Sequence, residues 1–403
     1  MNGLLDEQTA HFVSEHRRDD VRTLALSASR YPGVDMPRAL EQIAGWQMLE
    51  RKVPSWAAVE GLLLPPKLPL EQCSSQATAT YKARLVGSGK SLADLTGGLG
   101  IDCTFMGQAF EQVTYVERQE WLCRLARHNF PLLGLRQAEV TCGDAAEMLD
   151  GLPPVDCIFL DPARRDSRGG KVVAVADCEP DVSLLEPRLL AKARRVLVKL
   201  SPMLDLALAL HTLRHVAEAH VVAVDGECKE LLLLLRSGET AAEADDVPVH
   251  CVNLASATGD FLSPPFVFTR RGEQAAGCHY AVVPRAYLYE PDASLLKAGA
   301  FRSVAVAYGL EGLHPNSHLY TSDSSKEGFP GRVFRVEGCA GFGKRELTSL
   351  LGGLRRANLT VRNFPASVAE LRRRLKLAEG GTDYLFATTL ADGRKALLRC
   401  TKA

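Results

Sequence analysis

The chain has 403 residues, of which 46% are hydrophobic and 24% charged, and its 48 lysine and arginine residues balance 48 aspartate and glutamate residues. This length suffices for two to four domains, each with its own core. The apolar run at 231–235 is far too short to cross a bilayer, and the N-terminus lacks the basic start and apolar stretch of a secretion signal. The eleven cysteines form neither a Cys-x-x-Cys pair nor a cluster with histidine. We therefore expect a cytoplasmic protein without a metal site.

Residues 1–71 are predicted to form an N-terminal helical region. The apolar residues within 39–49 recur at helical spacing. The proline-rich segment 65–69 then interrupts this pattern, as is typical of a linker. Serine and threonine residues follow at 74–80 and favour the start of another helix, which we expect directly before the first strand.

Residues 72–240 are predicted to form one domain, in which residues 91–236 alternate between strands and helices, a pattern that builds an α/β fold with a doubly wound parallel sheet. Strands are predicted at 91–95, 112–116, 138–142, 155–160, 195–200, 220–224 and 231–236. Residues 225–230, which begin with Asp-Gly, are too short a connection for a parallel crossover between the last two strands. We expect these two strands to form an antiparallel hairpin.

A glycine-rich turn and three acidic residues follow the predicted strands. The first strand runs into Asp94-Leu-Thr-Gly-Gly-Leu-Gly100, and Glu117, Asp144 and Asp161 follow later strands. Glycine lets the backbone approach a ligand closely, and an acid after the second strand can accept hydrogen bonds from ribose hydroxyls. The pattern predicts a nucleoside-type cofactor. A nicotinamide dinucleotide fold is the alternative, but the turn lacks that fold's final small residue and gives Asp161-Pro162 no role.

This order of elements resembles the class I S-adenosylmethionine-dependent methyltransferase fold, which has six parallel strands and one antiparallel strand. The resemblance covers roughly residues 72–237. It implies that Asp94, Gly98 and Gly100 hold the methionine part of S-adenosylmethionine, that Glu117 binds the ribose, and that Asp144 lies beside the adenine.

Two further parts of the cofactor site are carried by the same resemblance. Thr96 stands where many family members have the first glycine of the turn. Upstream, residues 72–82 resemble a Gln-x-Ser-Ser-x-x-Thr-Ala-x-Tyr-Lys pattern of one bacterial family, which adds Tyr81 and Lys82 to the expected cofactor-binding residues. A plain capped helix explains this segment almost as well.

The segment Asp161-Pro-Ala-Arg164 ends the fourth predicted strand, where this fold places the methyl acceptor. It is similar to the Asp-Pro-Pro-aromatic motif of methyltransferases that act on exocyclic amines. The resemblance implies catalytic roles for Asp161, Pro162 and Arg164, with an arginine in place of the aromatic side chain that stacks on the base. A related group attacks uracil covalently through a cysteine, but Ser201 occupies that neighbourhood here. Direct, non-covalent transfer is therefore predicted.

The C-terminal part resembles two small α+β domains. Residues 247–330 are expected to form a ferredoxin-like domain, with strands at 266–269 and 280–283 and a helix near 292–298. Residues 331–403 resemble the THUMP-like domain of a bacterial methyltransferase family, a likeness carried by 362–365, 371–376 and 380–387. The true THUMP module, partnered by a ferredoxin-like domain, occurs in RNA-modifying enzymes, so the resemblance implies an RNA substrate.

Charge is unevenly distributed along the chain. Residues 331–403 contain 15 lysine and arginine against 6 aspartate and glutamate residues, a net charge of +9 that is offset by −9 over residues 1–330. Such asymmetry indicates an end that binds polyanions. Within it, a predicted helix carries the candidate RNA-binding residues Arg372, Arg373, Arg374 and Lys376, several of which can reach phosphates at once. A solvated helix face is the alternative.

We predict a methyltransferase that acts on structured RNA, either tRNA or rRNA, at a base nitrogen. One alternative is a small-molecule methyltransferase whose C-terminal domains only close the pocket. The other is a catalytically inactive protein that binds S-adenosylmethionine and RNA, against which the intact Asp161-Pro162 pair weighs.

Overall fold

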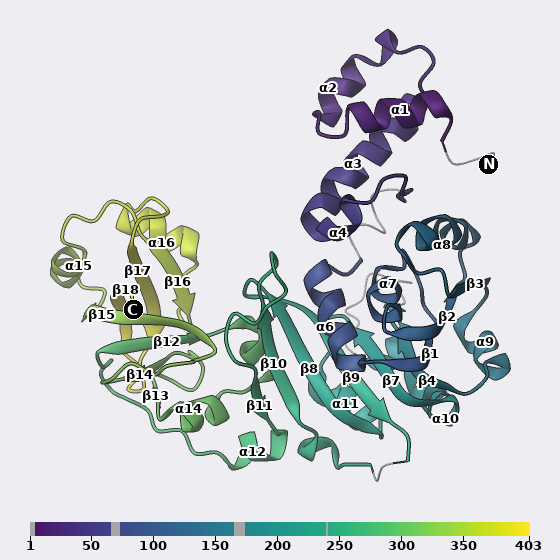
Figure 1. Cartoon of the computed structure of the whole chain (residues 1–403). Helices are drawn as coiled ribbons and strands as arrows, with labels where there is room; N and C mark the ends of the chain where they lie inside the picture. The colour runs from purple at the N-terminus through teal and green to yellow at the C-terminus, as the bar shows by residue number, and fades with distance from the viewer. Residues whose placement is uncertain (1–4, 66–72, 165–173, 239–240) are drawn as a thin grey trace. The chain divides into compact units, whose positions relative to one another are not determined.

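The computed structural model describes residues 5–65, 73–164, 174–238 and 241–403 (Figure 1). The chain divides into two compact units, one of Met1–Glu218, Glu230–Ala244 and Leu254–Asp260, the other of Ala219–Lys229, Asp245–Asn253 and Phe261–Ala403. Most of the linker predicted at 65–69 lies outside the described residues. In the described ranges, no helix has both the length and the apolar character that crossing a membrane requires.

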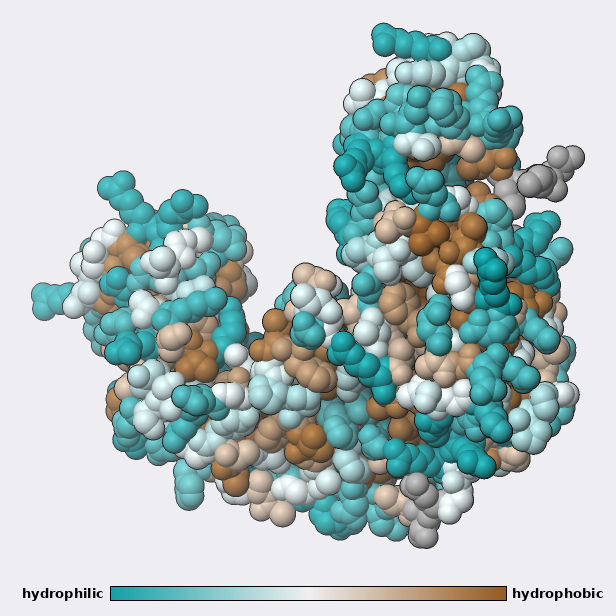
Figure 2. All heavy atoms as spheres, in the orientation of Figure 1, coloured by the Kyte–Doolittle hydropathy of each residue, from teal (hydrophilic) through white to brown (hydrophobic). Residues whose placement is uncertain are grey.

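Helices form the N-terminal region, as predicted. They are α1 (Glu7–Glu15), α2 (Val21–Leu26), α3 (Met36–Lys52) and α4 (Pro54–Ala57). The side chain of Asp6 begins α1 by accepting a hydrogen bond from the backbone N of Thr9 at 2.8 Å. Hydrophilic residues cover most of the visible face of these helices (Figure 2). On the inner face, Trp46 belongs to a core cluster that also includes Ala79 and Ile101, so this core continues into the α/β part.

The larger sheet has the strand order β3-β2-β1-β4-β7-β9-β8-β10-β11. Its strands are β1 (Gly89–Asp94), β2 (Phe110–Glu117), β3 (Ala138–Cys142), β4 (Val155–Leu160), β7 (Ala193–Leu200), β8 (Val216–Val224), β9 (Glu227–Arg236), β10 (Val249–Leu254) and β11 (Phe266–Phe268). The accompanying helices are α6 (Gln76–Val86), α7 (Ile101–Gly107), α8 (Glu120–Leu132), α9 (Ala145–Gly151), α10 (Val182–Lys192) and α11 (Leu206–Thr212). The pairs β1–β2, β1–β4, β2–β3 and β4–β7 are parallel, and β9 is antiparallel to β7.

The predicted hairpin joins β8 to β9 through Asp225 and Gly226 alone. Both residues have positive φ, 49° and 80°, which is the signature of a two-residue type I′ turn. Strand β8 therefore runs opposite to β9 and in the same direction as β7. Six parallel strands with one antiparallel strand between β7 and β8 result, and the predicted doubly wound fold is confirmed.

Strands β10 and β11 extend this sheet, although the sequence suggested that their residues belong to the ferredoxin-like domain. They pair antiparallel, with Val249 opposite Phe268. The strand predicted at 280–283 was wrong, because Tyr280 forms only an isolated bridge with Gly312. The apolar residues Val282 and Val283 that suggested it are 52% and 63% exposed, so they do not pack on a sheet.

A second sheet occupies the C-terminal part, with the order β13-β14-β12-β15-β18-β17-β16. Its strands are β12 (Tyr287–Pro291), β13 (Glu311–Gly312), β14 (Tyr320–Ser322), β15 (Gly331–Ala340), β16 (Asn358–Arg362), β17 (Asp383–Thr389) and β18 (Lys395–Lys402). The helices are α12 (Arg270–Ala275), α13 (Ala293–Ala298), α14 (Arg302–Tyr308), α15 (Lys344–Leu351) and α16 (Val368–Leu375). Phe334, Phe386 and Leu398 form part of its buried core. The helix expected near 292–298 is α13, which Asp292 caps.

Candidate functional site

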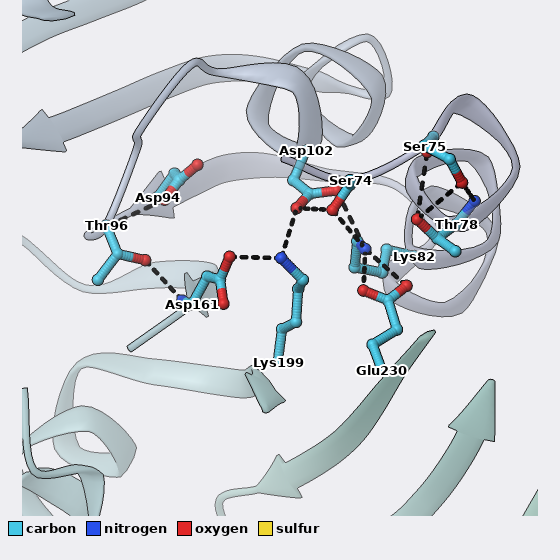
Figure 3. Close-up of polar contacts among 10 residues, drawn as sticks. All are labelled: Ser74, Ser75, Thr78, Lys82, Asp94, Thr96, Asp102, Asp161, Lys199 and Glu230. Atoms are coloured by element: carbon cyan, nitrogen blue, oxygen red, sulfur yellow. Dashed lines mark hydrogen bonds and ion pairs between the residues drawn. The ribbon is translucent and has the colours of Figure 1, made fainter. Parts of the chain in front are cut away.

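Asp94, Thr96 and Asp161 join the ends of β1 and β4, which are neighbouring parallel strands. Asp94 is the last residue of β1, and its Oδ1 accepts a hydrogen bond from the backbone N of Thr96 at 3.0 Å. The hydroxyl oxygen of Thr96 accepts one from the backbone N of Asp161 at 2.6 Å (Figure 3). The glycine-rich turn and the Asp161 motif, predicted separately, are thus held together at one edge of the sheet.

The glycines of the turn serve different purposes. Gly98 and Gly100 have φ of 56° and 84°, which favours glycine at both positions. A Cβ at Gly100 would lie 2.6 Å from the ring of Phe130, and one at Gly97 would lie 2.0 Å from the ring of Tyr115. A Cβ at Gly98 would meet only a carbonyl oxygen at 3.8 Å. Packing therefore requires Gly97 and Gly100, whereas Gly98 is the one whose Cα faces open space.

Glu117 lies at the end of β2 and contacts the same turn. Its Oε2 accepts a hydrogen bond from the backbone N of Gly98 at 2.9 Å, and its Oε1 accepts one from Gln119 at 2.8 Å. Asp144, after β3, uses Oδ1 to cap α9 through the backbone N of Ala146 at 2.8 Å. The four acids predicted at strand ends therefore follow β1, β2, β3 and β4, whose order in the sheet makes them neighbours.

Buried carboxylates give this edge of the sheet an acidic character. Asp94 is 1% exposed. Burial raises the pKa of Asp94 well above its ordinary value; the hydrogen bond from Thr96 opposes this shift, and the negative charges of Asp102, Asp161 and Glu117 reinforce it. A ligand with a positive charge would relieve this repulsion, because an opposite charge nearby favours the ionised carboxylate.

Lys82 lies at the centre of a buried ion cluster beside this edge (Figure 3). Its side chain, on α6, is completely buried. Nζ donates to Oε1 and Oε2 of Glu230 at 2.8 and 2.7 Å and to the hydroxyl oxygen of Ser74 at 3.1 Å. It also lies 3.1 Å from Oδ1 of Asp102, whose other oxygen accepts a hydrogen bond from Ser74 at 2.7 Å.

Lys199 continues this cluster toward Asp161. It lies near the end of β7, and its Nζ forms an ion pair with Oδ2 of Asp161 and lies 3.9 Å from Oδ2 of Asp102. Burial acts to lower the pKa of Lys199, but the carboxylates of Asp161, Asp102 and Glu230 outweigh it and raise the pKa above its ordinary value. Burial likewise acts to raise the pKa of Asp102, but the ammonium groups of Lys82 and Lys199 hold it below the usual range. Both side chains are therefore charged at neutral pH.

Sequence reasoning missed Asp102, Lys199 and Glu230. Lys199 interrupts the apolar run 196–200, in which the other members are at most 1% exposed, and Glu230 precedes 231–235, whose leucines are at most 2% exposed. A charge inside a buried strand requires a partner. That requirement was the available signal, but the sequence alone does not show where the partner lies.

The remaining predicted residues lie around this cluster. Tyr81 is 8% exposed, and Pro162 is also buried, whereas the side chain of Asp161 is 39% exposed. The backbone of Arg164 belongs to β5 (Ala163–Arg164), which pairs antiparallel with β6 (Cys178–Glu179). The Arg164 side chain and the residue after it lie outside the described part of the chain.

The packing role of Gly97 generates a stability prediction. We expect Gly97→Ala to destabilise the fold by about 1–3 kcal/mol, because its Cβ would have to displace the Tyr115 ring. Gly151→Ala is the matched control, since a Cβ there meets nothing within 4 Å. Urea unfolding of the three proteins checks this. Equal unfolding midpoints for Gly97→Ala and Gly151→Ala would contradict it.

Comparisons with known proteins identify the family of the chain. Residues 287–330 match a ferredoxin-like domain and residues 331–402 a THUMP domain-like family. A solved structure from Porphyromonas gingivalis, named "putative methyltransferase", is 39% identical, covers 100% of both chains and has a TM-score of 0.89. Two Mycobacterium tuberculosis proteins, each named an uncharacterized S-adenosylmethionine-dependent methyltransferase, are 25% identical over 325 residues, which is 76% of this chain and 79% of theirs. The chain therefore belongs to the family of S-adenosylmethionine-dependent methyltransferases that carry C-terminal ferredoxin-like and THUMP-like domains.

Proposed function

We propose that this methyltransferase acts on structured RNA, either tRNA or rRNA. The observation that carries the proposal is the net charge of +9 on residues 331–403, which include the THUMP-like match at 331–402. Positive charge concentrated in one domain gives affinity for the phosphates of nucleic acid, whatever the nucleotide sequence. The proposal is also supported by the pairing of that domain with a ferredoxin-like one, an arrangement that RNA-modifying enzymes use.

Helix α16 offers part of this charge to solvent. Arg373, Arg374 and Lys376 are exposed, whereas Arg372 is partly buried. Arg372 donates to the carbonyl oxygen of Ala357 at 3.3 Å and lies 3.5 Å from the carboxylate of Glu379. Arg372 thus has contacts that stabilise its own domain, and Arg374 also donates to the carbonyl oxygen of Phe342 at 3.4 Å. We therefore assign phosphate contact first to Arg373 and Lys376, and then to Arg374.

We further propose that the strand-end residues bind the cofactor. S-adenosylmethionine supplies a methyl group on a positively charged sulfur, and the buried carboxylates beside the turn suit a cation. In this assignment Asp94, Thr96, Gly98 and Gly100 shape the turn that faces the methionine part, Glu117 receives the ribose hydroxyls and Asp144 lies beside the adenine. The open space at Gly98 supports it, because a ligand can approach the backbone there.

The roles of Tyr81 and Lys82 at the cofactor stay predictions. The contacts described for Lys82 are with Ser74, Asp102 and Glu230, so its ammonium group serves the ion cluster. Tyr81 precedes it on α6, and burial raises the pKa of its hydroxyl, which therefore stays protonated. A tyrosine hydroxyl in that state can donate a hydrogen bond.

The acceptor segment is expected to work by direct transfer, with Asp161, Pro162 and Arg164 placing the substrate. The Ser201 hydroxyl oxygen accepts a hydrogen bond from the backbone N of Met203 at 3.3 Å. A serine without an adjacent base is a poor nucleophile. Transfer to a base nitrogen, which the Asp-Pro motif suggested, stays a prediction. A cytoplasmic location is likewise expected from the scattered cysteines alone.

The cofactor assignment makes a binding prediction. Gly98→Val places a branched side chain in the open space of the turn, and Asp94→Ala removes the buried acid, so both variants should lose affinity for S-adenosylhomocysteine while remaining folded. Isothermal titration calorimetry measures this. Asp150→Ala is the control, because that carboxylate is 76% exposed and pairs with Arg188. Wild-type affinity in both site variants would contradict the assignment.

The RNA assignment predicts a change in salt dependence. Alanine at Arg373 and Lys376 should weaken tRNA binding and reduce the slope of log affinity against log salt by about 0.7–0.9 for each phosphate that the variant no longer neutralises. A double variant at Arg18 and Lys90, exposed residues outside the C-terminal domains, removes the same charge and should leave the slope unchanged. Equal slopes for all three proteins would show that α16 is a solvated face.

The substrate itself is tested in cells that lack the gene. Nucleoside mass spectrometry of their total RNA should reveal one methylated nucleoside missing relative to the parent strain. Restoring the wild-type gene should return it. An unchanged nucleoside profile would contradict the RNA proposal and favour a small-molecule acceptor.

A further inference from the structure

The ion cluster forms a linear sequence of alternating charges, Glu230, Lys82, Asp102, Lys199 and Asp161 (Figure 3). The side chains of Glu230 and Lys82 are 2% and 0% exposed, and exposure then increases through 10% for Asp102 and 12% for Lys199 to 39% for Asp161. Among these five residues Asp161 is the most exposed, and Lys199 lies directly beside it, so this is the end of the cluster that a substrate can approach, whereas Lys82 and Glu230 are buried in the protein. The two groups at the open end decide what chemistry is possible there.

An amine acceptor fits this end poorly. When a nitrogen attacks the methyl group it acquires positive charge, which carboxylates stabilise and an ammonium group opposes. Here the carboxylate of Asp161 is already paired through Oδ2 with Nζ of Lys199. The ammonium group would also repel the hydrogens of an incoming exocyclic amine. The Asp161-Pro162 motif suggested a nitrogen acceptor, but its carboxylate is paired with the ammonium group of Lys199, which disfavours methyl transfer to an amine.

A hydroxyl acceptor has the opposite requirement. Its oxygen is a weak nucleophile until the proton leaves, and it becomes more negative as this happens. A fixed ammonium group beside it stabilises that charge, and a carboxylate beside it can take the proton. The carboxylates around Lys199 raise its pKa, so the group is a permanent cation rather than a base.

We propose that the acceptor is a ribose 2′-hydroxyl of RNA, with Lys199 and Asp161 as the groups that contact the reacting oxygen. The inference rests on the proposed RNA function and replaces the base nitrogen. The hydroxyl oxygen gains the methyl carbon and loses its proton to Asp161, from which the proton passes to water. The sulfur keeps the electron pair of the sulfur–carbon bond that breaks. Lys199 remains an ammonium group throughout.

The inner half of the cluster positions this pair. Asp102 lies between the two lysines, 3.1 Å from Nζ of Lys82 and 3.9 Å from Nζ of Lys199. Lys82 is in turn held by both carboxylate oxygens of Glu230. Removing Lys82, Asp102 or Glu230 would leave an uncompensated charge in the most buried part of the cluster, which is strongly destabilising. Lys82, Asp102 and Glu230 are therefore positioning residues, and Lys199 and Asp161 are the ones to test for catalysis.

The position of the transferred methyl group tests the proposal directly. Purified enzyme is incubated with deuterated-methyl S-adenosylmethionine and total RNA from cells that lack the gene. The RNA is digested to nucleosides, and tandem mass spectrometry separates the base from the ribose fragment. We expect the label on the ribose. Label on a base would overturn this inference and leave the RNA function intact, whereas RNA without label would overturn both.

Variants of the open end test the roles. Lys199→Met and Asp161→Ala should each lower the rate of ribose labelling by about a hundredfold or more. Affinity for S-adenosylhomocysteine, measured by calorimetry, should stay within about twofold and shows that the variants are folded. Lys199→Arg, which keeps the charge, should retain more activity than Lys199→Met. Lys90→Met, on the exposed start of β1, is the matched control. A wild-type labelling rate in Lys199→Met would overturn the role of Lys199.

Discussion

The fully buried ammonium group of Lys82 is the contact on which the site depends. It joins α6, which carries it, to α7 through Asp102 and to β9 through Glu230. Without that charge, the buried carboxylate of Glu230 would lose its ion pair and Asp102 would keep only the more distant Lys199, at a cost of about 3–5 kcal/mol for a broken buried pair. The same charge holds Asp102, which lies between the two lysines, so a fully buried residue helps to position the groups near Asp161.

The N-terminal helices pack against the same two helices that take part in the ion cluster. Their core cluster includes Trp46 and Trp56 together with Ala79 of α6 and Leu99 and Ile101 at the start of α7. Helices α6 and α7, which carry Lys82 and Asp102, are two of the three elements that Lys82 joins. Apolar burial on one side of these helices and ion pairing on the other thus hold the same backbone. The N-terminal helices thus share a core with the two helices that carry Lys82 and Asp102.

Local signals predicted the fold well, because the strand pattern, the Asp-Gly turn and the acids after the strands each depend only on residues that are close together in the sequence. The ends of β3 and β4 agree with the sequence analysis to the residue. What failed depends on distant contacts. Gly97 is fixed by a ring on β2, and Lys199 finds its partner 38 positions away in sequence. Val282 and Val283 have the side chains that are typical of a strand. Their exposure shows that they do not pack on a sheet, which the sequence alone does not reveal.

Thr96 departs from the family pattern, and the loop at Asp161 now depends on its side chain for a hydrogen bond. Glycine, which stands at this place in the class I methyltransferase pattern that the turn resembles, would offer only backbone freedom. Here the hydroxyl oxygen accepts the backbone N–H of Asp161 at 2.6 Å, so the turn and the acceptor loop share one hydrogen bond. The hydrogen bond therefore restricts position 96 to a side chain that can accept it, whereas any residue except proline at position 161 supplies the donor. A lineage that returned to glycine at position 96 would need another acceptor for that amide before the loop could keep its present course.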